Sequence, residues 1–170
     1  MADGARRSPL DDAQRSPLDG AALPDGLRER PFLAQLDVRV DAADPVARGA
    51  IESVVGPLPL EPNTVNDRPD GAVLWLGPDE WLVVGPPGAA ATLEAQLRDA
   101  IATGAPDAFV AIVDVSANRT TLDLAHADAR AILSGGCPID LHPRAFGQGQ
   151  CAQTLVARAG VILWQTVSEP

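Results

Sequence analysis

The sequence predicts an α+β fold in which antiparallel sheets carry helices packed on one face. The short apolar runs mostly come in pairs joined by Gly- or Pro-containing turns, and the helical segments follow such pairs rather than single strands. The chain has 170 residues, of which 46% are hydrophobic, enough for one ordinary domain with a core. The expected order of elements is β-α, β-β-α, β-β-α, β-β.

The first 30 residues differ in composition from the rest of the chain. They carry eleven charges, and their few large apolar residues are isolated among Ala, Gly and Pro. The pentapeptide Arg-Ser-Pro-Leu-Asp occurs twice there, at 7–11 and 15–19. Because such a stretch buries too little apolar area to offset its ordering entropy, we expect residues 1–30 to be a disordered tail and 31–170 to form a single domain. The alternative is a docking arm whose Leu residues settle on a partner.

The first predicted strand and helix follow the tail. Alternating apolar residues predict a half-buried strand over 33–40. Asp44 and Pro45 then supply an N-cap and a proline at the first helical position, and the apolar spacing predicts a helix that ends at Gly56. Residues 57–71 contain four prolines, so we expect an irregular connection there.

A hairpin and a second helix complete the predicted first half. Apolar runs at 72–76 and 81–84 flank a Gly-Pro-Asp-Glu turn, which predicts a β-hairpin. The helix that follows is expected over 90–101, with Glu94 and Arg98 paired one turn apart.

The second half repeats this rhythm. Its predicted elements are a central strand at 109–115, a strand at 120–124 that turns back from it, a short helix at 128–133, and a last hairpin at 151–157 and 161–167. The chain then ends directly after a strand. We therefore expect either an exposed sheet edge or a missing terminal strand and helix, so that the chain would be truncated at its C-terminus.

Charge and composition exclude several function classes. All 13 basic residues are Arg, against 23 Asp plus Glu, which gives a net charge of -10. Such an acidic surface repels nucleic acid and anionic lipid, and the absence of Lys removes Schiff-base and Walker-type phosphate chemistry. No apolar run approaches the roughly 20 residues that a membrane span needs, and the N-terminus has no signal-peptide core. The composition predicts a soluble, cytoplasmic protein.

Cysteine and histidine are too few for a metal site. The chain has two of each, without the close Cys pair that zinc sites usually contain. Cys137 with His142 as a base is conceivable, but a thiol that follows a helix C-terminus has a raised pKa, which opposes thiolate chemistry. Cys137 and Cys151 are therefore expected to be buried structural residues, and no metal is expected.

Other candidate chemistry has a structural alternative in each case. The Gly-Pro-Pro-Gly run at 85–88 lacks the spacing and the N–H donors of a phosphate loop. Asp114 could be a general base, but it could equally satisfy backbone donors in the turn at 116–119. Arg119 and Arg144 could bind a carboxylate, but each could as easily be a solvated turn residue or an interface anchor. The three tryptophans lie on predicted hairpin strands, so core packing is expected.

These segments resemble a known family. The runs 113–124 and 127–133 are similar to the folate-binding aminomethyltransferase (glycine-cleavage T-protein) superfamily. The continuation at 136–146, with its Cys-Pro-Ile-Asp-Leu-His-Pro sequence, resembles the gamma subunits of heterotetrameric sarcosine oxidase. Residues 76–83, 149–155 and 161–164 fit as well, so that the resemblance covers roughly residues 31–167.

The resemblance implies an aminomethyltransferase-like fold and a place in a flavoenzyme complex. That complex oxidatively demethylates sarcosine to glycine, forming peroxide and methylene-tetrahydrofolate. Its alpha, beta and delta subunits would be the partners of this chain, and FAD, FMN, NAD and tetrahydrofolate would lie on those other subunits, with none on this one. The chain itself would be a structural subunit without catalytic residues.

Two alternatives remain open. The chain could be a stand-alone folate-binding aminomethyltransferase-like protein, or a non-enzymatic, truncated interaction module. His126-Ala127 stands where the superfamily usually has Gly-Pro, which counts against a folate pocket.

The loop at 137–146 is the candidate partner interface. It combines apolar and charged side chains, a mixture that suits an interface centre with a polar rim, and its two prolines lower the ordering cost of association. The candidate interface residues are Ile139, Asp140, His142, Arg144 and Phe146. The alternative is a loop folded onto its own sheet, with Ile139 and Leu141 in the core.

Overall fold

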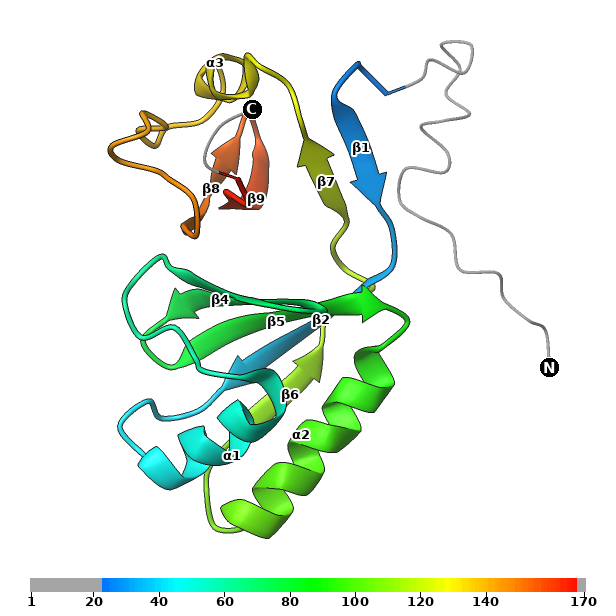
Figure 1. Ribbon diagram of the computed structural model, residues 1–170, viewed down its shortest axis with the longest axis vertical. Helices are drawn as coiled ribbons and strands as arrows, with labels where there is room; N and C mark the ends of the chain where they lie inside the picture. The colour runs from blue at the N-terminus through cyan, green and yellow to red at the C-terminus, as the bar shows by residue number, and fades with distance from the viewer. Residues whose placement is uncertain (1–22, 168–170) are drawn as a thin grey trace, which may run out of the picture.

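A five-stranded antiparallel sheet forms the centre of the structure, a computed structural model that describes residues 23–167. Its strand order is β3-β4-β5-β2-β6 (Figure 1). The strands are β2 (Leu33–Arg39), β3 (Val65–Arg68), β4 (Gly71–Gly77), β5 (Glu80–Pro87) and β6 (Ala111–Asp114). The predicted hairpin is confirmed as β4–β5, with Trp75 opposite Trp81.

Two helices cover one face of this sheet, α1 (Pro45–Val55) and α2 (Ala90–Gly104) (Figure 1). The side chain of Asp44 accepts hydrogen bonds from the backbone N–H groups of Val46 and Ala47, so α1 begins as predicted. Gly56 follows α1 with a φ of 76°, a conformation that glycine adopts at little cost. In α2, the predicted pair is formed: Arg98 Nη2 lies 2.6 Å from Glu94 Oε1.

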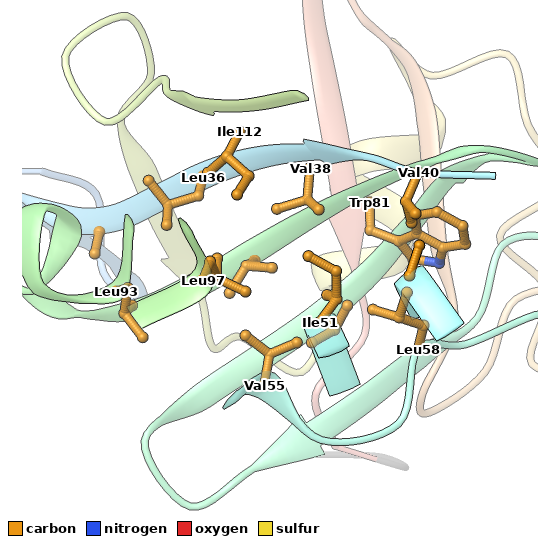
Figure 2. Close-up of a cluster of buried hydrophobic side chains, with 14 of the residues drawn as sticks. Leu36, Val38, Val40, Ile51, Val55, Leu58, Trp81, Leu93, Leu97 and Ile112 are labelled. Atoms are coloured by element: carbon orange, nitrogen blue, oxygen red, sulfur yellow. The ribbon is translucent and has the colours of Figure 1, made fainter. Parts of the chain in front are cut away.

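The main hydrophobic core lies between these helices and the sheet (Figure 2). Trp81, Leu36 and Ile51 are fully buried there, together with side chains from α2 and β6. The indole N–H of Trp81 donates to the carbonyl of Pro59 at 2.8 Å, so the one polar atom of that side chain is satisfied. This packing confirms the predicted burial of helix faces against one face of an antiparallel sheet.

A C-terminal hairpin packs on part of the opposite sheet face. It consists of β8 (Cys151–Val156) and β9 (Ala159–Trp164), which pair from Cys151–Trp164 to Val156–Ala159. Its Cys151, Ile162 and Trp164 meet a second buried cluster from β3, β4 and β5. The predicted last hairpin is thus confirmed.

A separate two-stranded sheet pairs the first strand of the described chain with a strand from its second half. Strand β1 (Leu27–Arg30) pairs with β7 (Thr121–Leu124), and the short helix α3 (Ala129–Ser134) follows β7. Because β1 is paired, the predicted tail boundary at residue 30 is wrong, and order begins earlier. Residues 1–22 of the predicted tail, including both Arg-Ser-Pro-Leu-Asp copies, lie outside the described residues.

Three further expectations are corrected. The predicted central strand at 109–115 is the edge strand β6, which pairs only with β2 and excludes Phe109. Strands β6 and β7 lie in different sheets rather than turning back on one another. The connection predicted at 57–71 contains β3, so the observed order is β-β-α-β-β-β-α-β-β-α-β-β.

The two hairpins β3–β4 and β8–β9 meet in a reciprocal arrangement. An antiparallel bridge joins Thr64 to Gln150 at the start of each hairpin. Four backbone hydrogen bonds surround the bridge in two matching pairs: Val65 N to Gly149 O (2.8 Å) and Cys151 N to Asn63 O (2.9 Å), then Trp75 N to Thr64 O and Gln165 N to Gln150 O (both 3.0 Å). Asn63 and Gly149 share a positive φ, 61° and 75°. The two halves of the chain are therefore built alike around this point.

No helix within residues 23–167 has the length and hydropathy that a membrane crossing would need.

Candidate functional site

The loop at 137–146 encloses a small hydrophobic cluster of its own. Cys137, Leu141 and Phe146 are buried at 9%, 6% and 8% exposure. They pack with partly buried side chains from α3, the loop and the C-terminal hairpin, namely Leu133, Ile139, Ala152, Val156 and Leu163. The loop thus has a core that fixes its shape against α3 and β8–β9.

Arg130 of α3 holds this loop to the end of β9. Its Nη1 donates to the carbonyl oxygens of Leu141 and Phe146, the latter at 2.9 Å, and its Nη2 donates to Gln165 Oε1 at 2.9 Å. Sequence reasoning missed this residue, because a lone Arg on a short helix is ordinarily solvated. The only signal was its position in the run 127–133 that carries the resemblance.

Polar side chains of the loop organise its turn and reach solvent. Asp140 Oδ1 accepts the His142 backbone N–H at 2.8 Å, and His142 Nδ1 accepts that of Arg144 at 3.2 Å. The carbonyl of His142 accepts the N–H groups of Ala145 and Phe146. Asp140, His142 and Arg144 are exposed, so a partner could contact their charged or polar ends.

The five candidate interface residues therefore divide into two groups. Asp140, His142 and Arg144 are exposed together on the loop, whereas Phe146 is buried and Ile139 is partly buried within the chain. Phe146, one of the five residues predicted for the interface, is 8% exposed and packs in the cluster that the loop forms with α3 and the C-terminal hairpin. Leu141 is also buried in this cluster and Ile139 is partly buried, as expected if the loop folds onto its own chain.

Both cysteines are free and buried. The thiol of Cys151 points to the carbonyls of Trp75 (3.3 Å) and Thr64 (3.6 Å). Burial raises the pKa of this thiol to about 11, so it is protonated at neutral pH, which opposes thiolate chemistry. Cys137 lies 3.8 Å from the Thr154 hydroxyl and packs in the loop cluster.

Asp114 takes part in the turn that follows β6. Its Oδ1 accepts the backbone N–H of Ser116 at 2.9 Å and the Ser116 hydroxyl. Ser116 Oγ in turn accepts the N–H of Gln35 at 2.9 Å, which links the turn to β2. The structural alternative for Asp114 is confirmed. Arg119 in the same turn has its Nη1 buried without a hydrogen-bond partner.

A cluster of charges lies on the sheet face opposite the helices. Arg39 Nη2 bonds both carboxylate oxygens of Asp79, at 3.0 and 3.1 Å. Burial raises the pKa of Glu80, and the neighbouring Asp37 carboxylate raises it further.

Across the described residues, no three or more His, Cys, Asp and Glu side chains gather in a way that could hold a metal ion.

Comparison with known proteins gives a consistent family. The family model described as "Sarcosine oxidase, gamma subunit family" matches residues 39–169. The sarcosine oxidase subunit gamma of Corynebacterium sp. (strain P-1) is 38% identical over 165 residues, which are 95% of this chain and 77% of that protein. The subunit gamma of Arthrobacter sp. is 37% identical over 164 residues, with the same shares covered.

A solved structure has the same fold. It is titled as the heterotetrameric sarcosine oxidase from Corynebacterium sp. U-96 in complex with pyrrole 2-carboxylate. The matching chain superposes with a TM-score of 0.81 at 32% sequence identity, covering 96% of this chain and 83% of that one.

Proposed function

Because the chain belongs to the sarcosine oxidase gamma-subunit family, we propose that it is the gamma subunit of a heterotetrameric sarcosine oxidase. In this role it assembles with the alpha, beta and delta subunits of a complex that oxidises sarcosine to glycine. The observation that carries the proposal is the match of 96% of the chain to one chain of such a heterotetramer.

The subunit contributes structure rather than chemistry. The candidate groups already have structural roles: Cys151 is a buried, protonated thiol, Asp114 holds a turn, and Arg130 holds a loop. FAD, FMN, NAD and tetrahydrofolate are then bound by the other subunits, and this chain holds none of them.

The exposed polar side of the 137–146 loop is part of the assembly surface. Asp140, His142 and Arg144 lie on a loop that its own hydrophobic cluster and Arg130 fix in advance. A fixed loop loses little conformational entropy on association, which favours binding. An aminomethyltransferase-like fold and a cytoplasmic location remain predictions from the sequence.

Co-expression tests the proposal. The full chain carries an affinity tag and is produced with the alpha, beta and delta subunits, and the purified material is analysed by size-exclusion chromatography. We expect one complex that contains all four chains and oxidises sarcosine. Elution of the tagged chain as a monomer beside an otherwise intact oxidase would contradict it.

Two measurements on the isolated chain test the non-catalytic role. No flavin absorption band and no binding of tetrahydrofolate are expected. Saturable tetrahydrofolate binding to the isolated chain would instead favour the stand-alone folate-dependent alternative.

A further inference from the structure

A stripe of exposed apolar side chains runs along the edge strand β6. Phe109 is 97% exposed and Val113 is 53% exposed. Within β6, Ile112 packs on the main core, so Ala111 and Val113 on either side of it point to the face away from the helices. Phe109 lies two residues before β6, next to Val110, which also packs on the core. We call Phe109, Ala111 and Val113 the β6 stripe. An aromatic side chain exposed to this degree gains no burial free energy within its own chain.

The β6 stripe lies outside the part of the sheet that the C-terminal hairpin covers. That hairpin packs on β3, β4 and β5, where Leu74 and Leu82 are 2% and 3% exposed. Strand β6 lies at the other side of the sheet, where it pairs only with β2. Within residues 23–167 nothing covers Phe109, and Val113 is covered only in part.

Acidic side chains border the stripe on the same face. Val113 lies opposite Asp37 of β2, and Ala111 lies opposite Arg39. Next to them, on β5 and its preceding turn, are Glu80 and Asp79. Asp79 already occupies the guanidinium of Arg39 through two hydrogen bonds, at 3.0 and 3.1 Å. The patch thus carries three carboxyl groups against one cation.

Asp37 and Glu80 place two carboxyl groups near each other on this face, with Arg39 as the cation beside them. Burial raises the pKa of Glu80, the adjacent Asp37 carboxylate raises it further, and Arg39 lowers it. Because Arg39 is already bonded to Asp79, a second cation from a partner would favour the ionised pair.

We propose that the β6 stripe and the Asp37–Glu80 pair together form a docking surface for a basic surface on a partner subunit of the oxidase. The partner offers an apolar pocket for Phe109, flanked by Arg or Lys side chains that meet the carboxyl pair. An aromatic anchor surrounded by polar contacts is the usual arrangement at the centre of an interface. This inference rests on the proposed function as a gamma subunit.

Two other occupants fit less well. A second copy of this chain, with a net charge of -10, would bring its own acidic patch to the interface and be repelled. A strand added to the edge of β6 would need the carbonyl of Ile112, which already accepts a hydrogen bond from Arg98 Nη2 at 2.9 Å. The side chains of β6, rather than its backbone edge, are therefore the docking surface.

The test measures the affinity of the full chain, fluorescently labelled, for a complex of the other three subunits. Phe109→Ala is expected to raise the Kd about 30-fold or more, as for an interface anchor, with an unchanged Tm. Leu60→Ala is the matched control, because Leu60 is exposed at 52% on the connection before β3, away from the β6 stripe. The Kd of this variant should stay within about 2-fold of the wild-type value, since substitutions at exposed positions outside an interface have little effect.

The charge arm uses the double variant Asp37→Asn, Glu80→Gln. We expect weaker binding and a shallower dependence of the Kd on salt concentration, because an ion pair across the interface is lost. If only Phe109→Ala weakens binding, the basic nature of the partner surface is overturned.

The outcomes separate the two proposals. Tight binding of the wild-type chain that Phe109→Ala leaves unchanged overturns the docking surface, and the gamma-subunit function stands. Failure of the wild-type chain to bind overturns both. A dimer of the isolated chain that Phe109→Ala dissociates would also contradict the docking surface, by assigning the stripe to a second copy.

Discussion

Glu80 and Cys151 are titratable side chains held where ionisation is unfavourable. Burial raises the pKa of each, and for Glu80 the neighbouring Asp37 adds to the effect. A raised pKa means that the folded chain binds the proton more tightly than the unfolded chain does. In its protonated form, each residue therefore stabilises the fold at a pH below its ordinary pKa. That contribution is lost as the pH rises through the higher pKa of the folded chain.

Glu80→Gln should raise the Tm at pH 7. The stability that comes from protonated Glu80 is present below the ordinary pKa of 4.5 and is lost as the pH rises through the higher pKa of the folded state. Gln cannot ionise, so the variant avoids this loss, and its advantage should shrink below about pH 4.5. Thermal unfolding between pH 3.5 and 7.5 measures it. Glu61→Gln, at an exposed position, is the control; a Glu80→Gln chain less stable than wild type at pH 7 would contradict the account.

Cys151 should make stability fall in alkaline solution. Between the ordinary pKa of 9.0 and the folded value of about 11, the unfolded chain loses the thiol proton while the folded chain keeps it, so unfolding becomes more favourable. The decline should begin near pH 9 and level off above about pH 11. Comparing wild type with Cys151→Ala by chemical denaturation isolates the effect of this thiol. Parallel pH profiles of the two chains would show that burial does not perturb Cys151.

At the scale of the elements, the loop at 137–146 depends on a single guanidinium. Arg130 joins α3, the loop and the end of β9 through three acceptors: Leu141 O, Phe146 O and Gln165 Oε1. Lys, with a compact ammonium group, cannot span three such positions in the way that the planar fork of Arg does. The loop should therefore be the first part of the described fold to open when Arg130 is replaced.

Arg130→Met should loosen this loop and cost about 1–3 kcal/mol of stability, because buried carbonyl groups lose their donors. Limited proteolysis with trypsin measures the effect directly, since the bond after Arg144 lies within the loop. Faster cleavage there is expected in Arg130→Met and in Arg130→Lys, but not in the control Arg158→Met, which alters an exposed residue between β8 and β9. Equal cleavage rates at Arg144 in all four chains would refute the role of Arg130.

The predictability of each element from the sequence depended on where its stabilising contacts come from. Helix α1 and the β4–β5 hairpin could be predicted, because Asp44, Pro45 and a Gly-Pro-Asp turn act locally. Strand β1 could not, because its sequence Leu-Arg-Glu-Arg has no apolar alternation and becomes a strand only by pairing with β7, some 90 residues later. Strand β3 pairs with the adjacent β4, but its sequence Val-Asn-Asp-Arg also lacks apolar alternation, so it was missed.

The candidate site shows the same division. The charged residues of the 137–146 loop were placed on the surface by their chemistry, and the structure exposes Asp140, His142 and Arg144. Burial of Phe146, and exposure of Phe109, are decided by which elements come to lie against each side chain. The spacing of residues along the chain does not reveal which elements will pack together. For this reason the apolar strand β6 was predicted to be central, although it lies at the edge of the sheet.

At the scale of the whole molecule, two similar halves meet at Thr64 and Gln150, and their contact surface is buried around Cys151. This arrangement places the helices α1 and α2 at one end and the 137–146 loop at the other (Figure 1). The β6 stripe lies on the five-stranded sheet, and the exposed polar side of the loop lies at the other end of the molecule. Two such separated surfaces would allow the chain to contact more than one partner subunit at once.

The central claim is that this chain is an integral subunit of a sarcosine-oxidising heterotetramer. Native mass spectrometry of the complex purified through its alpha subunit tests the claim most directly, since it counts the chains in each assembly. We expect a single dominant species with one copy each of the alpha, beta and delta subunits and one copy of this chain. An active three-chain assembly without this chain, found even when it is co-expressed in folded form, would contradict the account.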